Sequence, residues 1–270
     1  MGHIKAMSEH DTREGELDEA VDRIIELGKP RLHRSFPQQL LTGMVGGSEL
    51  AFGVLALLVV EHQTGSVLLG ALAFSVGFLA LQLGHSELFT EGFLVPVTTV
   101  FAKEGTVPQL LRLWGGTFVG NMVGGWVAMG LIVLGFPELH GLLATRGAHF
   151  ASTGPTWSSL ALAVLAGAAL TLMTRMHNGT DDEMAKVAAT VGIAFVVAGT
   201  GVLHSVLDAL LLFGAILSGS GVTYLDWLGF EWWVVLANMA GGTLLVTATR
   251  IVRSKDALDR KSRTAAHQDD

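Results

Sequence analysis

The stretch GHSELFTEGFLVP (residues 84–96) decides the fold, because it interrupts an apolar segment that runs from residue 67 to residue 102. One helical membrane crossing takes about 20 residues, so this segment is too long for a single crossing. It contains two glycines, a proline and several polar or ionisable side chains at the expected depth of the membrane centre. A second apolar segment, residues 187–218, is interrupted similarly by LHSVLDALLLFGA (residues 203–215). Interrupted hydrophobic segments at corresponding positions of two halves point to a transport site.

The composition predicts an all-α polytopic membrane protein. Half of the 270 residues are hydrophobic, and they form blocks of roughly twenty separated by short polar stretches. In lipid only helices and closed barrels satisfy the hydrogen bonds of the backbone. The chain has no cysteine, which excludes disulfides, thiolate chemistry and cysteine-ligated metals.

Six membrane-spanning segments are expected, of which the second and fifth are broken. They cover residues 39–60, 67–102, 110–134, 157–173, 187–218 and 232–251. They form a transmembrane channel domain (38–253) between a cytoplasmic N-terminal segment (1–37) and a cytoplasmic tail (254–270). The N-terminal segment is expected to contain an amphipathic helix with Leu17, Val21 and Ile24 on one face, lying on the membrane or on a neighbouring subunit. Asp11 and Glu14 can form a capping box at its start.

The basic residues predict the orientation. With both termini in the cytoplasm, 16 of the 17 Lys and Arg residues lie on the cytoplasmic side, and only Arg146 lies outside. This asymmetry predicts an even number of crossings in a bacterial-type inner (cell) membrane.

Short matches indicate an internal repeat. NMVGG (121–125) recurs as NMAGG (238–242), and His85-Ser86 recurs as His204-Ser205, at offsets of 117 and 119 residues. We therefore predict two inverted repeats of three helices, about residues 38–136 and 157–253, with the broken segments on opposite sides of a pseudo-two-fold axis. The glycines of these motifs are expected to allow close helix packing. Asn121 and Asn238 either bond the free backbone groups of a broken helix or line the pore.

The broken segments also suggest a chemistry. A restarting half-helix presents its N-terminus, with about half a positive charge, to the membrane centre, where it favours a small anion. His204 lies in the second interruption among Val202, Leu203, Val206 and Leu207. Burial disfavours a charged ring, so we expect a neutral imidazole that can donate a hydrogen bond to an anion or lend it a proton.

Three motifs resemble the formate/nitrite transporter family: SELFT (86–90), GNMVGG (120–125) and His204-Ser205. The resemblance covers residues 38–253. It implies an aquaporin-like protomer with its own pore, assembled as a homopentamer, that passes small monovalent anions with or without a proton. Leu88 and Phe89 would form hydrophobic constrictions, and Thr90 would hydrogen-bond across the pore to His204, the central polar group.

The chain departs from the family pattern at both loops. Glu91 stands where the family usually has Ser, and His204 is preceded by Leu203 instead of Glu. Glu91 and Asp208 therefore place carboxylates at or near the loop tips. They either form a proton relay with His85 and His204 or cap the free amides of the half-helices.

The sequence thus predicts a channel or proton-coupled transporter for small monovalent anions such as formate and nitrite, located in a lipid bilayer. We expect neither enzymatic activity nor a cofactor, metal or nucleic-acid partner. Two alternatives remain: an aquaporin-like pore for small neutral solutes, against which the absence of an Asn-Pro-Ala pair speaks, and a haem-binding membrane subunit using His85 and His204.

Overall fold

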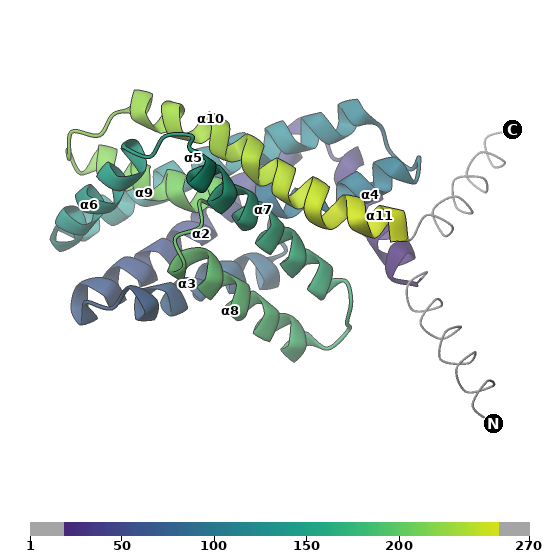
Figure 1. Cartoon of the computed structure of the whole chain (residues 1–270), viewed down its shortest axis with the longest axis horizontal. Helices are drawn as coiled ribbons and strands as arrows, with labels where there is room; N and C mark the ends of the chain where they lie inside the picture. Colours follow the sequence, from purple (N-terminus) through teal and green to yellow (C-terminus); the bar gives the residue numbers. More distant parts are fainter. Residues whose placement is uncertain (1–18, 254–270) are drawn as a thin grey trace, which may run out of the picture.

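The computed structural model describes residues 19–253, and this part of the chain consists of helices and connecting loops without a strand (Figure 1). Within it, five helices are long and apolar enough to cross a membrane: α2 (Phe36–Thr64), α3 (Val67–Gly84), α5 (Val107–Gly135), α7 (Trp157–His177) and the continuous run Tyr224–Ala248. That run joins α10 (Tyr224–Ala240) to the π-helix η3 (Gly241–Ala248), and α11 (Thr249–Arg253) continues it. Figure 1 shows this run as one long helix across the molecule. The predicted all-α class is confirmed.

Both predicted breaks are present. In the first segment α3 ends at Gly84, and the helix resumes as η1 (Phe89–Phe93) and α4 (Val95–Phe101). In the second, α8 (Glu183–Gly199) is followed by a loop and by α9 (Ser205–Leu217). The apolar pieces after the breaks, Phe89–Phe101 and Ser205–Leu217, are too short to cross a membrane alone.

The helix starts are encoded locally by capping boxes. The Thr106 side chain accepts from Gln109 N–H and the Gln109 side chain returns a bond to the Thr106 backbone. Thr223 and Asp226 do the same at the start of α10. The last span therefore begins at Tyr224, eight residues before the predicted residue 232, because the cap at Thr223 was not recognised in the sequence.

The segment between the predicted third and fourth spans contains a helix that was not predicted from the sequence. η2 (Pro137–Leu139) leads into α6 (His140–Ala151), which packs against α9. Leu139, Leu143 and Phe150 are buried. These positions share one helical face, so the periodicity was available in the sequence.

The N-terminal helix packs on its own chain. Residues 19–33 are helical, and Val21 and Ile24 are buried against residues of α4 and its flanks, namely Leu94, Val95 and Ala102. The expected placement on the membrane or on another subunit is therefore wrong for this face, because α4 already covers it. Leu17, Asp11 and Glu14 lie outside the described residues.

Glycines bring two helix pairs into backbone contact. A Cβ at Gly124 of α5 would lie 1.9 Å from Met44 O of α2, and one at Gly47 of α2 would lie 2.1 Å from Asn121 O. The pair formed by α7 and the last span repeats this: a Cβ at Gly241 would lie 1.9 Å from Val164 O, and one at Gly167 would lie 2.0 Å from Asn238 O. The two halves of the chain therefore share the same close, glycine-mediated helix contact, and each broken segment lies beside one such helix pair.

Candidate functional site

The two broken segments meet at Thr90 and His204. Thr90 Oγ1 lies 2.8 Å from His204 Nε2, and both residues have 0 % exposure. Thr90 lies in η1, directly after the first break, and His204 is the N-cap residue of α9, directly after the second break. The structure thus joins side chains from interruptions that are 114 residues apart in the sequence.

The capping role of His204 fixes its tautomer. His204 Nδ1 accepts a hydrogen bond from Leu207 N–H at 3.0 Å, so Nδ1 carries no proton. The single N–H of the neutral ring is therefore on Nε2, and it points to Thr90 Oγ1. Asp208 completes the cap, because its Oδ2 accepts from His204 N–H at 2.8 Å. Among the predicted roles of Asp208, this geometry matches capping.

Two buried asparagines hold the interruptions in the same way. Asn121 Nδ2 donates to Gly43 O at 2.8 Å and to Glu87 O at 2.9 Å, and its Oδ1 accepts from Phe89 N–H at 2.8 Å. The Asn121 amide therefore satisfies backbone groups that the broken helix leaves free. This favours the predicted role of bonding the free backbone groups over the predicted role of lining the pore.

Asn238 repeats this set of bonds in the other half. Its Nδ2 donates to Ala163 O at 2.7 Å and to Leu203 O at 2.9 Å, and its Oδ1 accepts from Ser205 N–H at 3.0 Å. Both N–H bonds of the amide are again used on backbone carbonyls.

These bonds correct the predicted register of the repeat. Asn121 bonds Glu87 O, and Asn238 bonds Leu203 O, so Glu87 corresponds to Leu203 and Leu88 corresponds to His204. His85 does not correspond to His204: it ends α3 with a left-handed φ of 53°, whereas His204 begins α9. The short His-Ser match was therefore a coincidence of two residues.

Apolar and aromatic side chains surround the contact. Leu88 is fully buried, and the Phe89 ring packs edge-on at 5.2 Å against the rings of Phe93 and Phe118. The Phe78 ring lies 6.3 Å from the His204 ring. Thr90 and His204 thus lie in a largely apolar environment, in which an unpaired charge would be costly.

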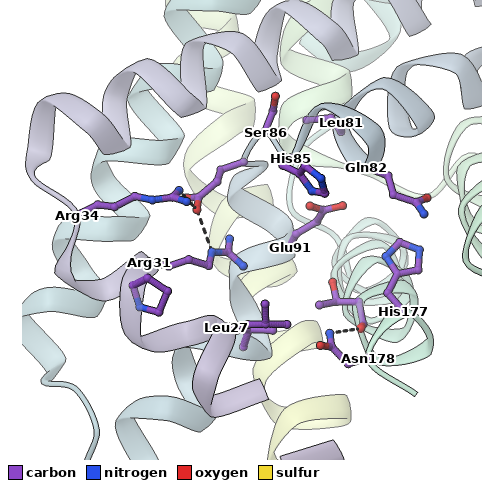
Figure 2. Close-up of a pocket in the computed structure, with 14 residues that line it drawn as sticks. Leu27, Arg31, Arg34, Leu81, Gln82, His85, Ser86, Glu91, His177 and Asn178 are labelled. Atoms are coloured by element: carbon purple, nitrogen blue, oxygen red, sulfur yellow. Dashed lines mark hydrogen bonds and ion pairs between the residues drawn. The ribbon is translucent and has the colours of Figure 1, made fainter. Parts of the chain in front are cut away.

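A cavity of about 360 Å³, here named the Glu91 cavity, opens beside the first interruption (Figure 2). Figure 2 shows the Glu91 carboxylate pointing into it beside His85, with Arg31 facing from the N-terminal helix and His177 from α7. Its lining consists of Leu27, Pro30, Arg31, Arg34, Leu81, Gln82, His85, Ser86, Glu87, Glu91, Val95, Thr174, His177 and Asn178.

Glu87 ties this cavity to the N-terminal helix. Its Oε1 accepts from Arg31 Nε at 2.9 Å and from Arg34 Nη1 at 2.5 Å. Sequence reasoning assigned no role to these three residues, because Glu87 and the arginines are more than 50 residues apart and no local spacing connects them.

A smaller cavity of about 90 Å³, here named the Asp208 cavity, lies beside the second interruption. It is lined by Leu57, Arg146, His149, Phe150, Val197, Ala198, Gly201, Val202, Leu207, Asp208 and Leu211. Arg34 of the Glu91 cavity precedes α2, whereas Leu57 of the Asp208 cavity lies late in α2, so the two cavities lie toward opposite ends of that helix. Arg146, from the helix that sequence reasoning missed, forms an ion pair with Glu61 at this end.

The predicted relay residues are thus divided between the two cavities. His85 and Glu91 line one, Asp208 lines the other, and His204 lines neither. Glu91, unlike Asp208, makes no hydrogen bond through its carboxylate to any of the residues that the structure describes.

Comparison with known proteins agrees with this architecture. Residues 18–252 match the family model of the formate/nitrite transporter. The "Uncharacterized transporter YrhG" of Bacillus subtilis is 29 % identical over 113 residues, which cover 40 % of this chain and 42 % of that protein. The "Formate channel BtFdhC" of Bacillus thuringiensis is 25 % identical over 245 residues, which cover 83 % of this chain and 90 % of that protein.

Solved structures show the same fold. An "FNT family ion channel" superposes with a TM-score of 0.74 at 17 % identity, covering 87 % of this chain and 97 % of the other. A "Pentameric formate channel with formate bound" superposes with a TM-score of 0.66 at 18 % identity, covering 80 % of this chain and 96 % of the other. The chain is therefore a multi-pass membrane protein that belongs to the formate/nitrite transporter family, whose members are channels and transporters and not enzymes.

Proposed function

We propose that each protomer conducts small monovalent weak-acid anions, with formate and nitrite as the first candidates, through its own pore with His204 as the central polar group. The observation that carries this function is the buried Thr90–His204 hydrogen bond between two interrupted helices, with a cavity toward either side. The formate channel among the relatives supports formate as a substrate.

The geometry at the constriction supports an anion. His204 Nε2–H, now directed to Thr90, can turn to a passing oxygen, and the Thr90 hydroxyl offers a second donor. The N-terminus of α9 adds a positive partial charge at the same place. Leu88 and Phe89 are proposed to form the apolar slits that strip water from the ion.

The assembly and orientation are part of the same proposal. A homopentamer is supported by the pentameric formate channel of the same fold. An inverted repeat of six spans is supported by the matching asparagine bonds and glycine contacts of the two halves. The basic residues support cytoplasmic termini in a bacterial-type inner membrane.

Replacing His204 by Asn is expected to reduce anion uptake about ten- to a hundredfold. Asn is a good N-cap, so α9 keeps its first turn, but the shorter side chain cannot reach Thr90. A hydrogen bond to a charged group contributes about 1.5–3 kcal/mol, and each 1.4 kcal/mol changes an equilibrium about tenfold. The measurement is uptake of formate, nitrite, lactate and hydrosulfide into vesicles containing the purified protein, at two pH values.

His62→Ala is the matched control, because His62 is exposed at the end of α2. Equal background uptake of every anion by wild type and His204→Asn vesicles would contradict the proposal. If the vesicles conducted water or glycerol and no anion, the aquaporin-like pore would replace it.

A further inference from the structure

His204 can donate a hydrogen bond to an anion, but its surroundings prevent it from supplying a proton. Its only N–H is on Nε2, because Nδ1 accepts from Leu207 N–H at 3.0 Å. Giving up the Nε2 proton would leave an imidazolate, which is far too basic to form near neutral pH. Adding a second proton at Nδ1 would place it against the Leu207 N–H, donor to donor, and would break the cap of α9. A proton that accompanies the anion must therefore come from another group.

Glu91 is placed to supply that proton on one side of the constriction. It directly follows Thr90, and its carboxylate points into the Glu91 cavity beside His85 (Figure 2). Arg31 faces the same space and interacts electrostatically with Glu91. The Arg31 Nε bonds Glu87, whereas its two Nη groups make no hydrogen bond to the described part of the chain. An anion held by these Nη groups would thus lie within the cavity that contains the Glu91 carboxyl.

The other ionisable groups that line the Glu91 cavity are Arg34, His85, Glu87 and His177. Arg34 is paired with Glu87, and His177 Nε2 lies 2.9 Å from Thr190 Oγ1. His85 is exposed at the end of α3, and Glu91 itself is partly exposed, so the water of the cavity can reach its carboxyl group. Glu91 therefore has both a source of protons and an anion site within one cavity.

Asp208 lines the cavity on the other side of the Thr90–His204 contact. Its Oδ2 caps His204, and it interacts electrostatically with Arg146 of α6 across the Asp208 cavity, which His149 also lines. Glu231 of α10 is 3 % exposed and interacts electrostatically with Asp208, and the Trp227 side chain lies beside its carboxyl group. Two neighbouring buried carboxyls share at least one proton, because burying two like charges together is costly.

We propose that Glu91 and Asp208 exchange a proton with the transported anion on the two sides of the Thr90–His204 contact, so that the substrate crosses the constriction as a neutral weak acid. The carboxyl proton of Glu91 moves to an oxygen of the anion held by Arg31, which leaves a Glu91 carboxylate beside the guanidinium. The neutral acid passes His204, which keeps its own proton. The Asp208 carboxylate then takes the proton from the acid, and the anion leaves past Arg146.

Solution on each side completes the cycle. Glu91 regains a proton from the water of its cavity, and Asp208 releases one to the water on its side, so one proton accompanies each anion. This proton exchange requires the anion of a weak acid and excludes anions of strong acids such as nitrate. A charge at mid-membrane is costly, and the neutral form removes that cost. This inference rests on the proposed function.

Glu91→Gln tests the role of Glu91, because the amide has the same shape and carries no exchangeable acid proton. We expect formate uptake by vesicles to fall at least tenfold, together with formate-driven acidification of the vesicle interior measured with an enclosed pH dye. Glu91→Asp, which can still carry the proton, is expected to retain both. The matched control is Glu183→Gln, because the Glu183 side chain is 71 % exposed and forms an ion pair with Lys186 of its own helix.

The outcomes separate the inference from the function on which it rests. Unchanged or faster formate uptake by Glu91→Gln would overturn the inference alone, since Glu91 would then only repel anions. Nitrate uptake by wild type at the rate of formate would also overturn it. No uptake of any anion by wild type above empty vesicles would overturn the proposed function as well.

Asp208→Asn provides the second test, and it decides the matter if Glu91→Gln does not assemble. The Asn Oδ1 can still accept from His204 N–H, so the cap remains while the proton carrier is lost. Uptake and acidification are expected to fall as in Glu91→Gln, with Asp181→Asn as the control at an 85 % exposed side chain. Full activity of Asp208→Asn would overturn its role.

Discussion

Asn121→Leu and Asn238→Leu are each expected to lose most of the stability of the folded protomer. Each substitution keeps the number and branching of the side-chain heavy atoms and removes the amide that satisfies two carbonyls and one N–H at the interruption and in the neighbouring helix. An unsatisfied buried polar group costs about 1–3 kcal/mol, so three of them cost about 3–9 kcal/mol. Total stabilities are about 5–15 kcal/mol, so this loss is severe. The melting temperature in detergent, measured by tryptophan fluorescence, is expected to fall by about 10 °C or more. This follows because each kcal/mol of lost stability lowers the melting temperature by about 2–4 °C.

Ser75→Ala is the control for this experiment, because the Ser75 hydroxyl donates to Leu72 O of its own helix and makes no other side-chain hydrogen bond within residues 19–253. Asn121→Asp separates the two kinds of bond, because the carboxylate can accept from Phe89 N–H and cannot donate to Gly43 O or Glu87 O. It is expected to be almost as harmful as Asn121→Leu. Melting temperatures of both Leu variants within 2 °C or so of wild type would show that water or neighbouring groups satisfy these backbone atoms, against the role argued here.

Gly124→Ala is expected to have the second-largest effect. The added Cβ would lie 1.9 Å from Met44 O and 2.6 Å from Met44 C, which are backbone atoms of α2 and cannot rotate away. The helices α2 and α5 must therefore move apart, which costs about 3 kcal/mol or more. The shift also pulls Asn121, one turn earlier in α5, away from its bonds to the interruption. Both the melting temperature and anion uptake are expected to fall.

The matched control lies in the same helix. A Cβ at Gly115 would meet nothing within 4 Å, so Gly115→Ala changes only the intrinsic helix preference. That preference favours Ala by about 1 kcal/mol, and Gly115→Ala is expected to be as stable as wild type or slightly more stable. Equal melting temperatures for the two Ala variants would show that the α2–α5 contact tolerates a wider spacing. Gly241→Ala tests the equivalent contact in the other half, because a Cβ at Gly241 would lie 1.9 Å from Val164 O.

The parts of the fold that were predictable are those with a local physical cause. Apolar runs longer than one crossing required a break, and the breaks at residues 84–89 and 199–205 lie where glycine and polar side chains interrupt those runs. The glycine motifs were expected to allow close packing, and they do. The start of the last span and helix α6 were missed although the cap at Thr223 and the apolar face of α6 were visible in the sequence.

The candidate site was predictable only in part. His204 was predicted from its place in the second interruption and Thr90 from a resemblance to a family, and the structure places the two side chains 2.8 Å apart. The match of His85 to His204 was wrong, because two residues carry too little information to fix a register, whereas three hydrogen bonds around each asparagine define it. Nothing in the sequence connected Glu87 to Arg31 or Glu61 to Arg146, since each pair joins segments that are distant in the chain.

The sequence by itself determined the membrane class, the two interruptions and the close contact of glycine-rich helices, because hydrophobic length, caps and small side chains act over one or two helical turns. Only the tertiary structure decided what the interruptions do. It made His204 a cap whose Nδ1 is occupied, and it placed Glu91 and Asp208 in separate cavities, each with an arginine from another part of the chain. The charge and hydrogen-bond state of a buried group depends on every neighbour that folding brings to it, and those neighbours are not encoded in local sequence spacing.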